Sequence, residues 1–423
     1  MERRKYLGQF LALFTGTAVS QVFNFIAYPL LARLYSPGDF GILGTFVAAA
    51  AIPGALACGR FELALAIAPS SGRQAVLWLS LIIAAGVATL ATGGMAAYWW
   101  DVSAPMFGIA VPLLFTSILL TGAANALTMY LMRHELFRFA SVGGVVRTIV
   151  TVTVQVGIVL VWRSPAGLLL GFALGLVAQT AVALAIARAH FPIGLPRGPH
   201  MRAMFRRFRP QVSVDIPGSI LAALSVNLLP FFLQFLYGTR AVGFYTVGQR
   251  LAVVPLQLFN DSLSQTFFQR AARAREARGE FWQEFALTLL LAGSVSVVML
   301  GGMMLFAEPV ISIYLGKKWL FAGTILVTLA PMLAIRSVVM SVATTVFVLR
   351  RPQWLLFHNI ASVLAIAVAF VFALVTRTSL LSFVTALAVL QGAEYTVFGV
   401  ILSVAVRRGF LRAGASRQIL GQA

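Results

Sequence analysis

The amino-acid sequence predicts an all-α polytopic membrane protein with about twelve transmembrane helices in two six-helix lobes. Of its 423 residues, 60% are hydrophobic and only 10% are charged, whereas soluble domains carry about 25% charged residues. The formal net charge of +20 is spread over short loops, as expected where basic residues gather on the cytoplasmic side of a membrane. A nucleic-acid partner is therefore not expected.

Twelve apolar segments are long enough to cross a bilayer, which takes roughly 20 mostly apolar residues. The six predicted spans of the first half are 8–34, 40–68, 75–98, 106–131, 141–162 and 166–187. The six of the second half are 212–236, 241–265, 282–306, 322–349, 354–376 and 380–406. Breaks rich in charge, proline or glycine separate these segments.

Loop charges predict the orientation. With the N-terminus in the cytoplasm, 22 of the 32 Lys and Arg residues lie on the cytoplasmic side and five lie outside. The other five are arginines within the apolar segments. Because cytoplasmic loops carry the excess of Lys and Arg, both termini are expected in the cytoplasm.

The chain is expected to contain two lobes, at 1–187 and 212–406, with a basic linker and interfacial helix at 188–211 and a basic tail at 407–423. A short pattern recurs at an offset of 202 residues: Leu34-Tyr35 precedes a glycine by the same spacing as Leu236-Tyr237. Both copies lie between the first and second spans of a half. Six spans per half would give the two halves the same orientation in the membrane.

Ionisable side chains inside the apolar segments are the candidate functional residues. A charge at membrane depth costs about 2.5 kcal/mol or more, and such residues usually face a partner, a wet cavity or a substrate. The arginines are Arg33, Arg60, Arg147, Arg250 and Arg336, and the acids are Glu62, Asp215, Asp261 and Glu394. The excess of arginine indicates an anionic cargo.

The second span contains the tract from Gly59 to Glu62, shortly after Pro53, so its helix is expected to break there. Arg60 and Glu62 are two residues apart and would point in different directions on an ideal helix, so neither is expected to be the other's main partner. In one interpretation Arg60 lines a cavity and Glu62 is a gating or proton-linked acid. In the alternative, the span ends near Ala57 and both charges lie near the cytoplasmic surface.

The eighth span is unusually polar, because it also contains Gln249 and Asn260. At 3.6 residues per turn, Arg250, Gln257, Asp261 and Ser264 share a broad face, which is expected to meet water. The alternative is ordinary interhelical hydrogen bonding, which explains single amide side chains better than a whole polar face.

The sequence around the remaining intramembrane charges is less informative about their roles. Arg147 either lines the cavity or extends to the cytoplasmic headgroups, Arg336 lies mid-span and favours a cavity, and Arg33 lies near the outer headgroups. Asp215, before Pro217, would cap the seventh span or gate an opening beside it. Glu394 is interpreted as a partner for one of the arginines.

Catalytic and metal-binding patterns are not evident, so neither an enzyme, a cofactor nor a metal site is expected. No His or Cys spacing suits a metal, and there is no phosphate-binding Gly-x4-Gly-Lys-Ser/Thr loop. The four histidines all fall in or near predicted cytoplasmic loops: His134, His190, His200 and His358.

The segment from Pro29 to Gly44 resembles the opening of polysaccharide-biosynthesis membrane proteins, the Wzx-type oligosaccharide flippases of the multidrug/oligosaccharidyl-lipid/polysaccharide exporter superfamily. The tract Gly59-Arg60-Phe61-Glu62 is similar to the charged second-span signature of that family. The resemblance implies two six-helix lobes around a central cationic cavity in the bacterial inner membrane. It implies that Arg60 and Arg250 face the diphosphate of a lipid-linked glycan, with the lipid tail left in the bilayer.

The resemblance therefore predicts a flippase for an undecaprenyl-diphosphate-linked oligosaccharide, working by alternating access without covalent chemistry. Membrane lipid and other polysaccharide assembly proteins would be its partners. Two alternatives stay open: a cation-coupled multidrug exporter of the same superfamily, and a membrane glycan polymerase or ligase. An exporter of organic cations would need a more acidic cavity, and a polymerase usually has a larger external loop than 307–321.

Overall fold

The structure of the protein is a computed structural model that describes residues 2–100, 107–191 and 194–420. These residues form helices and connecting turns without any strand, which confirms the predicted all-α membrane fold. Contacts divide the chain into two units, Met1–Phe231 and Phe232–Ala423. Residue 106, where the fourth span was predicted to begin, and the end of the tail at 421–423 lie outside the described residues.

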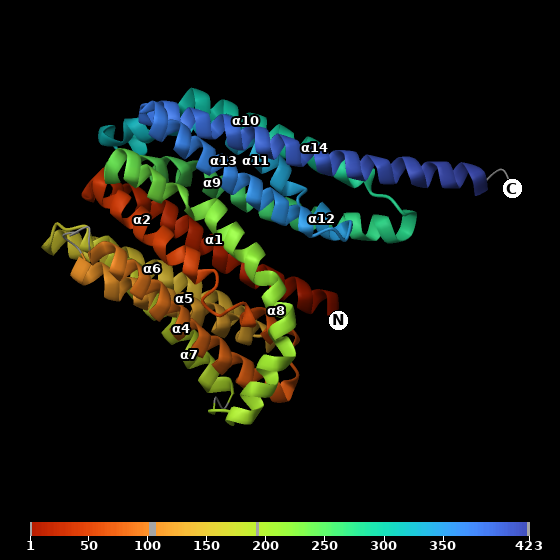
Figure 1. The fold of residues 1–423 in the computed structure, drawn as a ribbon, viewed down its shortest axis with the longest axis horizontal. Coiled ribbons are helices and arrows are strands. Elements are labelled where there is room, and N and C mark those ends of the chain that lie inside the picture. Colours follow the sequence, from red (N-terminus) through yellow and green to blue (C-terminus); the bar gives the residue numbers. More distant parts are fainter. Residues whose placement is uncertain (1, 101–106, 192–193, 421–423) are drawn as a thin grey trace. The chain divides into compact units, whose positions relative to one another are not determined.

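Unit 1 contains the helices of the first half and the helix that follows them (Figure 1). They are α1 (Glu2–Leu34), α2 (Pro37–Gly54), α3 (Phe61–Ile67), the 3-10 turn η1 (Ser70–Gly72), α4 (Arg73–Trp100), α5 (Phe107–Arg133), α6 (Phe137–Val161), α7 (Ala166–His190) and α8 (Gly198–Asn227). Its core lies mainly between α3, α4 and α5, and α8 closes it with Met204, Phe208 and Val212.

Unit 2 contains the helices of the second half. They are α9 (Leu229–Arg278), whose first residues still belong to unit 1, α10 (Trp282–Tyr314), the 3-10 turn η2 (Lys317–Trp319), α11 (Leu320–Ser341), α12 (Thr345–Val348), α13 (Gln353–Thr376) and α14 (Leu380–Leu420). Helix α11 packs against α10 and α14, and α13 packs against α14. The interior of this unit therefore centres on α11 and α14.

Nine helical segments among the described residues are long and apolar enough to cross a membrane. One of them, Gly198–Val253, includes a break at Gly238, where the backbone leaves helical geometry (φ 79°, ψ 176°). Two predicted spans, 212–236 and 241–265, lie on either side of that break. Together with α1 and the α2–α3 pair, these segments account for the twelve predicted spans.

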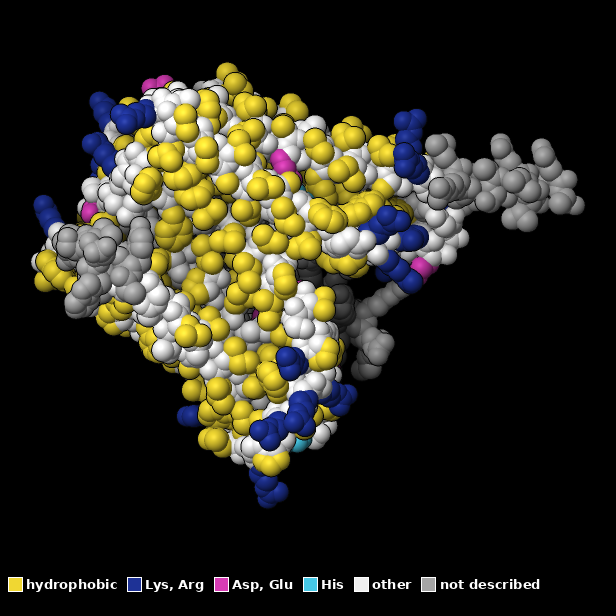
Figure 2. Space-filling model, viewed as in Figure 1, with side chains coloured by type: hydrophobic (Ala, Val, Ile, Leu, Met, Phe, Trp, Pro, Cys, Tyr) yellow, Lys and Arg dark blue, Asp and Glu magenta, His cyan; other side chains and the backbone are white. Residues whose placement is uncertain are grey.

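Helix α8 differs from the predicted separation between an interfacial helix and a seventh span. It runs without interruption from Gly198 through Pro210 and Pro217 to Asn227, and it packs against α2, α3 and α4. Its polar side exposes the arginines Arg202, Arg206, Arg207 and Arg209. In Figure 2, one of several groups of Lys and Arg lies over the start of α8, and the visible surface between these groups is mostly hydrophobic. The predicted domain limits at 187 and 211 remain predictions.

The repeated Leu-Tyr pattern has the same structural role in both units. Ser36 caps α2 in a reciprocal pair with Asp39, because each accepts a hydrogen bond from the other's backbone N–H. The Tyr35 hydroxyl, next to this cap, donates to the Gln155 carbonyl of α6 at 2.8 Å. In unit 2 the Tyr237 hydroxyl donates to the Thr378 carbonyl, just after α13, at 3.0 Å. Each tyrosine thus joins the corner after the first predicted span of its half of the chain to a residue in, or just after, the fifth predicted span of that half.

Helices α6 and α7 approach closely along a stripe of glycines spaced four residues apart: Gly167, Gly171 and Gly175. A Cβ on Gly171 would lie 2.8 Å from the Thr151 carbonyl oxygen. A Cβ on Gly175 would lie 2.9 Å from the Arg147 carbonyl oxygen. Only glycine permits this approach, as in other small-x3-small helix pairs within membranes.

Candidate functional site

The predicted break in the second span is present. Helix α2 ends at Gly54, a run of turns follows, and α3 begins at Phe61. Both Gly59 (φ 53°) and Arg60 (φ 64°) have left-handed backbone geometry, which is uncommon for a residue other than glycine. The break therefore fixes the Arg60 side chain at the start of α3.

Arg60 is held between two carboxylates. Its Nε lies 2.5 Å from Oδ2 of Asp215 on α8, and its Nη1 lies 3.4 Å from Oε1 of Glu62. The Arg60 side chain is 26% exposed, against 12% for Glu62 and 46% for Asp215. Asp215 is thus the closer partner of Arg60. The spacing of Arg60 and Glu62 predicted that Glu62 would not be the main partner, but it did not identify Asp215.

Asp215 does not cap a helix, which corrects one of its two predicted roles. Because α8 continues through Pro210 and Pro217, Asp215 lies well inside the helix. Prolines are tolerated in membrane helices where other groups satisfy the freed carbonyls. The Ser219 hydroxyl donates to the Asp215 backbone carbonyl at 2.9 Å, one turn along the same helix. Asp215 instead joins α8 to the start of α3.

The Arg60 cluster has one cation and two acids, so it is not an excess of positive charge. The second carboxylate oxygen of Glu62, Oε2, is buried without a hydrogen-bond partner within the described part of the chain. A buried, unpaired carboxylate oxygen is costly unless it gains a proton or a partner. The cluster can therefore act as a latch between α3 and α8 that a proton or an anionic ligand would loosen.

The polar face predicted for the eighth span lies on the second part of α9. Arg250, Gln257 and Asp261 are exposed, whereas Ser264 is half-buried. Gln249 and Asn260 are also half-buried, and Asn260 accepts a hydrogen bond from the Ser337 hydroxyl of α11 at 2.9 Å. Interhelical hydrogen bonding thus explains Asn260, while the most polar members of the face remain exposed.

Arg336 lies next to Ser337 on α11 and is half-buried. Its guanidinium carbon lies 6.0 Å from the ring centroid of Tyr395 on α14, within range of a cation–π contact. It also interacts electrostatically with Tyr245 on α9. Arg336 therefore lies on α11 near Tyr245 of α9 and Tyr395 of α14.

The other two predicted cavity cations have different surroundings. Arg147 is half-buried between α6 and α7, where it lies 5.3 Å from the Phe172 ring centroid and 3.4 Å from Oε1 of Gln179. These contacts are interhelical. Arg33 lies in the last turn of α1 and is exposed. No shared site for Arg33, Arg147 and Arg60 is evident among the described residues.

Glu394 pairs with a histidine, which corrects the expected arginine partner. Its Oε1 lies 2.5 Å from Nδ1 of His358 on α13. His358 was predicted to lie in or near a loop, but it is buried within the second turn of α13. The two residues are 36 positions apart on different helices, so their contact depends on helix rotations that no local pattern specifies. The only indication of this contact in the sequence was that His358 and Glu394 are polar residues on two consecutive predicted spans.

The described residues contain no group of three or more His, Cys, Asp or Glu side chains arranged to hold a metal ion.

A family model described as "Polysaccharide biosynthesis protein" matches residues 30–324, which is well over half of the chain. The chain belongs to the polysaccharide biosynthesis protein family. This confirms the resemblance that the motifs around Tyr35 and Arg60 indicated. This protein is a multi-pass membrane protein. No curated protein matches the chain in sequence.

Solved structures of related fold cover almost the whole chain. The lipid II flippase MurJ, in an inward closed conformation, has a TM-score of 0.71 at 13% identity and covers 97% of this chain and 91% of its own. An inward-facing multidrug resistance MATE family transporter of the MOP superfamily has a TM-score of 0.62 at 16% identity, covering 96% and 95%. A MOP superfamily transporter from Pyrococcus furiosus has a TM-score of 0.60 at 16% identity, covering 96% and 94%. At sequence identities this low, the structural similarity establishes only that this protein has the same fold as these transporters.

Proposed function

We propose that this protein is a flippase that moves an undecaprenyl-diphosphate-linked oligosaccharide from the inner to the outer leaflet of the bacterial inner membrane. The observation that carries the proposal is the exposed polar face of α9, on which Arg250, Gln257 and Asp261 lie along one predicted span. Such a face is costly against lipid. It suits a transporter whose cargo has a polar headgroup, in a family of polysaccharide biosynthesis.

The chemistry of the arginines favours a diphosphate. A guanidinium keeps its charge at any physiological pH and donates two parallel hydrogen bonds to a phosphate. Arg250 is exposed on α9, and Arg336 lies one helix away on α11. Arg60 is already paired with Asp215 and Glu62, so we assign it to a latch that opens during transport. No bond in the cargo is formed or broken.

Transport by alternating access follows from this assignment. The headgroup would bind through arginine on the cytoplasmic side and be released outside, while the lipid tail stays in the bilayer. Other polysaccharide assembly proteins would deliver and consume the lipid-linked glycan. Membrane potential favours outward movement of an anionic headgroup where the cell interior is negative.

A cation-coupled multidrug exporter is the second candidate. The observation that favours it is a pocket on α13 and α14 lined by the aromatic side chains of Trp354, Phe357 and Phe398 beside Glu394. Aromatic rings and a carboxylate suit an organic cation. We rank this function second because Glu394 already has a cationic or neutral partner in His358.

Deleting the gene and identifying the lipid-linked glycan that accumulates tests the proposal. We expect a complete oligosaccharide on its lipid to accumulate in the inner leaflet, and the wild-type gene to restore export. A gene encoding Arg250→Ala should fail to restore export at normal membrane level. Arg163→Ala, which changes an exposed arginine between α6 and α7, is the matched control.

Other outcomes would exclude the flippase. Shorter glycan chains with normal translocation would indicate a polymerase. Normal glycan together with sensitivity to cationic drugs would indicate the exporter.

A further inference from the structure

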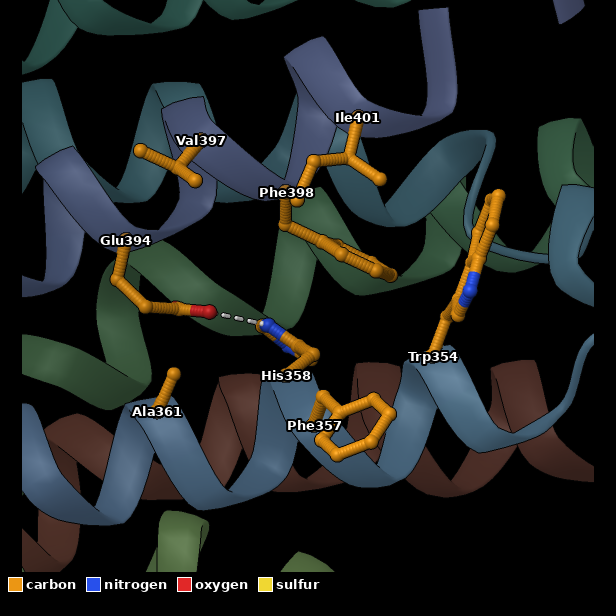
Figure 3. A pocket seen from close by; sticks show the side chains of 8 residues that line it. All are labelled: Trp354, Phe357, His358, Ala361, Glu394, Val397, Phe398 and Ile401. Atoms are coloured by element: carbon orange, nitrogen blue, oxygen red, sulfur yellow. Dashed lines mark hydrogen bonds and ion pairs between the residues drawn. The ribbon is translucent and has the colours of Figure 1, made fainter. Parts of the chain in front are cut away.

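A buried histidine–glutamate pair lies beside an open apolar pocket in unit 2. The pocket has a volume of 540 Å³ and lies between α13 and α14 (Figure 3). The side chains of His358 and Glu394 are only 5% and 10% exposed, and Nδ1 and Oε1 are 2.5 Å apart. Apart from this pair, hydrophobic side chains line the pocket, among them Phe357 and Val397.

The surroundings of His358 leave little room for compensating charge. Its ring stacks on Phe398 at a centroid distance of 4.5 Å and an interplanar angle of 14°, and it meets Tyr395 at 5.2 Å. Oε2 of Glu394, the second carboxylate oxygen, is buried and has no hydrogen-bond partner in the residues that the structure describes. The imidazole is thus the hydrogen-bond partner of only one of the two carboxylate oxygens among the described residues.

The charge balance of the pair depends on one proton. With that proton the pair is neutral overall, as imidazolium with carboxylate or as imidazole with carboxylic acid. Without it, a net negative charge remains in an apolar site, which is costly unless another cation approaches. The geometry therefore favours a proton held between the two side chains.

Two cations lie near the pair. The guanidinium carbon of Arg351 lies 5.4 Å from the ring centroid of Trp354, which lines the pocket, whereas Arg336 shares the contact residue Tyr395 with His358. On α14 the neighbour is Tyr395, and across it on α11 lies Arg336, whose guanidinium interacts electrostatically with the Tyr395 hydroxyl. Glu394 also interacts electrostatically with Tyr395. Helix α12, which packs on α13, has no titratable residue. Helix α10, which packs on α14, contains Glu284, paired with Arg278, and the exposed Glu308.

We propose that His358 and Glu394 form a proton-binding site that controls whether Arg336 is available to an anionic headgroup. With the proton bound, the pair is self-neutralising and Arg336 remains available to an anionic headgroup bound along α9, the helix to which its neighbour Ser337 is joined through Asn260. When water enters the pocket and the proton leaves, the carboxylate draws the guanidinium of Arg336 and weakens headgroup binding. This step rests on the proposed diphosphate cargo, but the proton site itself does not.

The proton site is tested without any cargo. Purified full-length protein in lipid nanodiscs, labelled with 15N in its histidine rings, gives signals from only four histidines. His358→Gln assigns the His358 signal by its disappearance, and the exposed His190 is an internal reference. We expect the His358 signal to titrate differently in wild type and Glu394→Gln, while His190 titrates identically in both. Identical titration of His358 in the two proteins would overturn the proton site.

The control of Arg336 is tested with geranylgeranyl diphosphate as the probe. We expect wild type to bind the probe at least tenfold more weakly at alkaline than at acidic pH. Glu394→Gln should bind tightly at both, and His358→Gln should bind weakly at both. Because the two variants change affinity in opposite directions, general misfolding does not reproduce the pattern. Glu308→Gln, an exposed acid of the same unit, is the matched control and should follow wild type.

The diphosphate of the probe also changes its protonation with pH, and this effect is the same for every protein. Comparing wild type with Glu394→Gln therefore separates the effect of the protein from that of the probe. The same pH dependence in wild type and Glu394→Gln would overturn control by the pair. No binding of the probe at any pH, with the histidine titration as expected, would overturn the diphosphate cargo and leave the proton site standing. Tight binding of tetraphenylphosphonium that depends on Glu394 and displaces the bound proton would show that an organic cation is the pocket's occupant, which overturns the assignment to Arg336 control.

Discussion

At the scale of single residues, the structure shows that intramembrane charge in this protein is mostly paired. Arg60 contacts two acids, Glu394 contacts His358, and Arg147 is enclosed by an aromatic ring and an amide. Arg250 and Asp261 differ from these residues in that their side chains are exposed. Substitutions should therefore divide into those that lower stability and those that lower transport alone.

Removing Arg60 should lower stability, because it leaves Glu62 and Asp215 with uncompensated charge. Breaking a fully buried pair costs about 3–5 kcal/mol. Since Asp215 is 46% exposed and is screened by solvent, we expect about 2 kcal/mol for Arg60→Ala, measured as a lower unfolding midpoint in detergent. Adding Glu62→Gln should recover part of the loss. An unchanged midpoint, equal to that of Arg163→Ala, would contradict the pairing.

His134 should make stability depend on pH. It follows α5 outside the membrane-spanning segments, its ring lies 3.8 Å from Phe191, and its Nε2 is buried without a hydrogen-bond partner among the described residues. Burial lowers the pKa of His134, and the nearby charges of Arg73 and Arg133 lower it further. The unfolded chain, with an ordinary histidine pKa of about 6.5, then binds a proton at higher pH than the folded protein does.

Stability from His134 is therefore complete above the unfolded pKa, and it is lost as the pH falls from that value through the folded pKa. The unfolding midpoint of wild type should fall more steeply with acidification than that of His134→Phe, which keeps the aromatic contact and cannot titrate. Thermal unfolding of both proteins across this pH window measures the difference. Parallel curves would show that His134 contributes nothing to the pH dependence.

At the scale of elements, local patterns predicted the helices well and their contacts poorly. Hydropathy locates a span such as α13 because the requirement for about 20 apolar residues is local. The capping pair of Ser36 and Asp39 is also local. By contrast, Arg60 and Asp215 are 155 residues apart, and their contact depends on how α8 packs on α3. Their pairing follows from tertiary packing, which periodicity within one helix does not specify.

The glycine stripe of α7 lets this helix approach α6 closely. Gly175→Ala should separate α7 from α6, because the new Cβ would lie 2.9 Å from the Arg147 carbonyl oxygen. Overpacking of this kind costs roughly 1–3 kcal/mol. Gly157→Ala on α6, where no atom lies within 4 Å of the new Cβ, is the control. Equal unfolding midpoints for the two variants would contradict the close approach.

At the scale of the whole molecule, the two units repeat one plan. Tyr35 and Tyr237 each join the corner after a first predicted span to a residue in, or just after, a fifth predicted span. Six predicted spans in each half of the sequence would give the two halves the same topology across the membrane. This plan agrees with the distribution of loop arginines, which predicts that both termini lie in the cytoplasm.

A reporter fused after Ala423 tests the topology. We expect alkaline phosphatase at this position to be inactive, because it folds only outside the cytoplasm, and green fluorescent protein to be fluorescent. The same pair of reporters placed after Arg163, in a predicted outer loop, should give the opposite result. Phosphatase activity at Ala423 would require an odd number of spans and would exclude two halves of six spans each.

Transport should depend on the chemistry of arginine at position 250 as well as on its charge. A guanidinium matches two oxygens of a diphosphate at once, whereas an ammonium does not. Arg250→Lys should therefore keep its membrane level and lose about tenfold in glycan export, equivalent to about 1.4 kcal/mol, and Arg250→Ala should lose nearly all export. Arg60→Ala should instead lower the membrane level together with export, because its carboxylate partners stay behind. Measuring level and export in the same cells separates these effects, and full export by a well-expressed Arg60→Ala, Arg250→Ala double variant would show that neither guanidinium serves the headgroup.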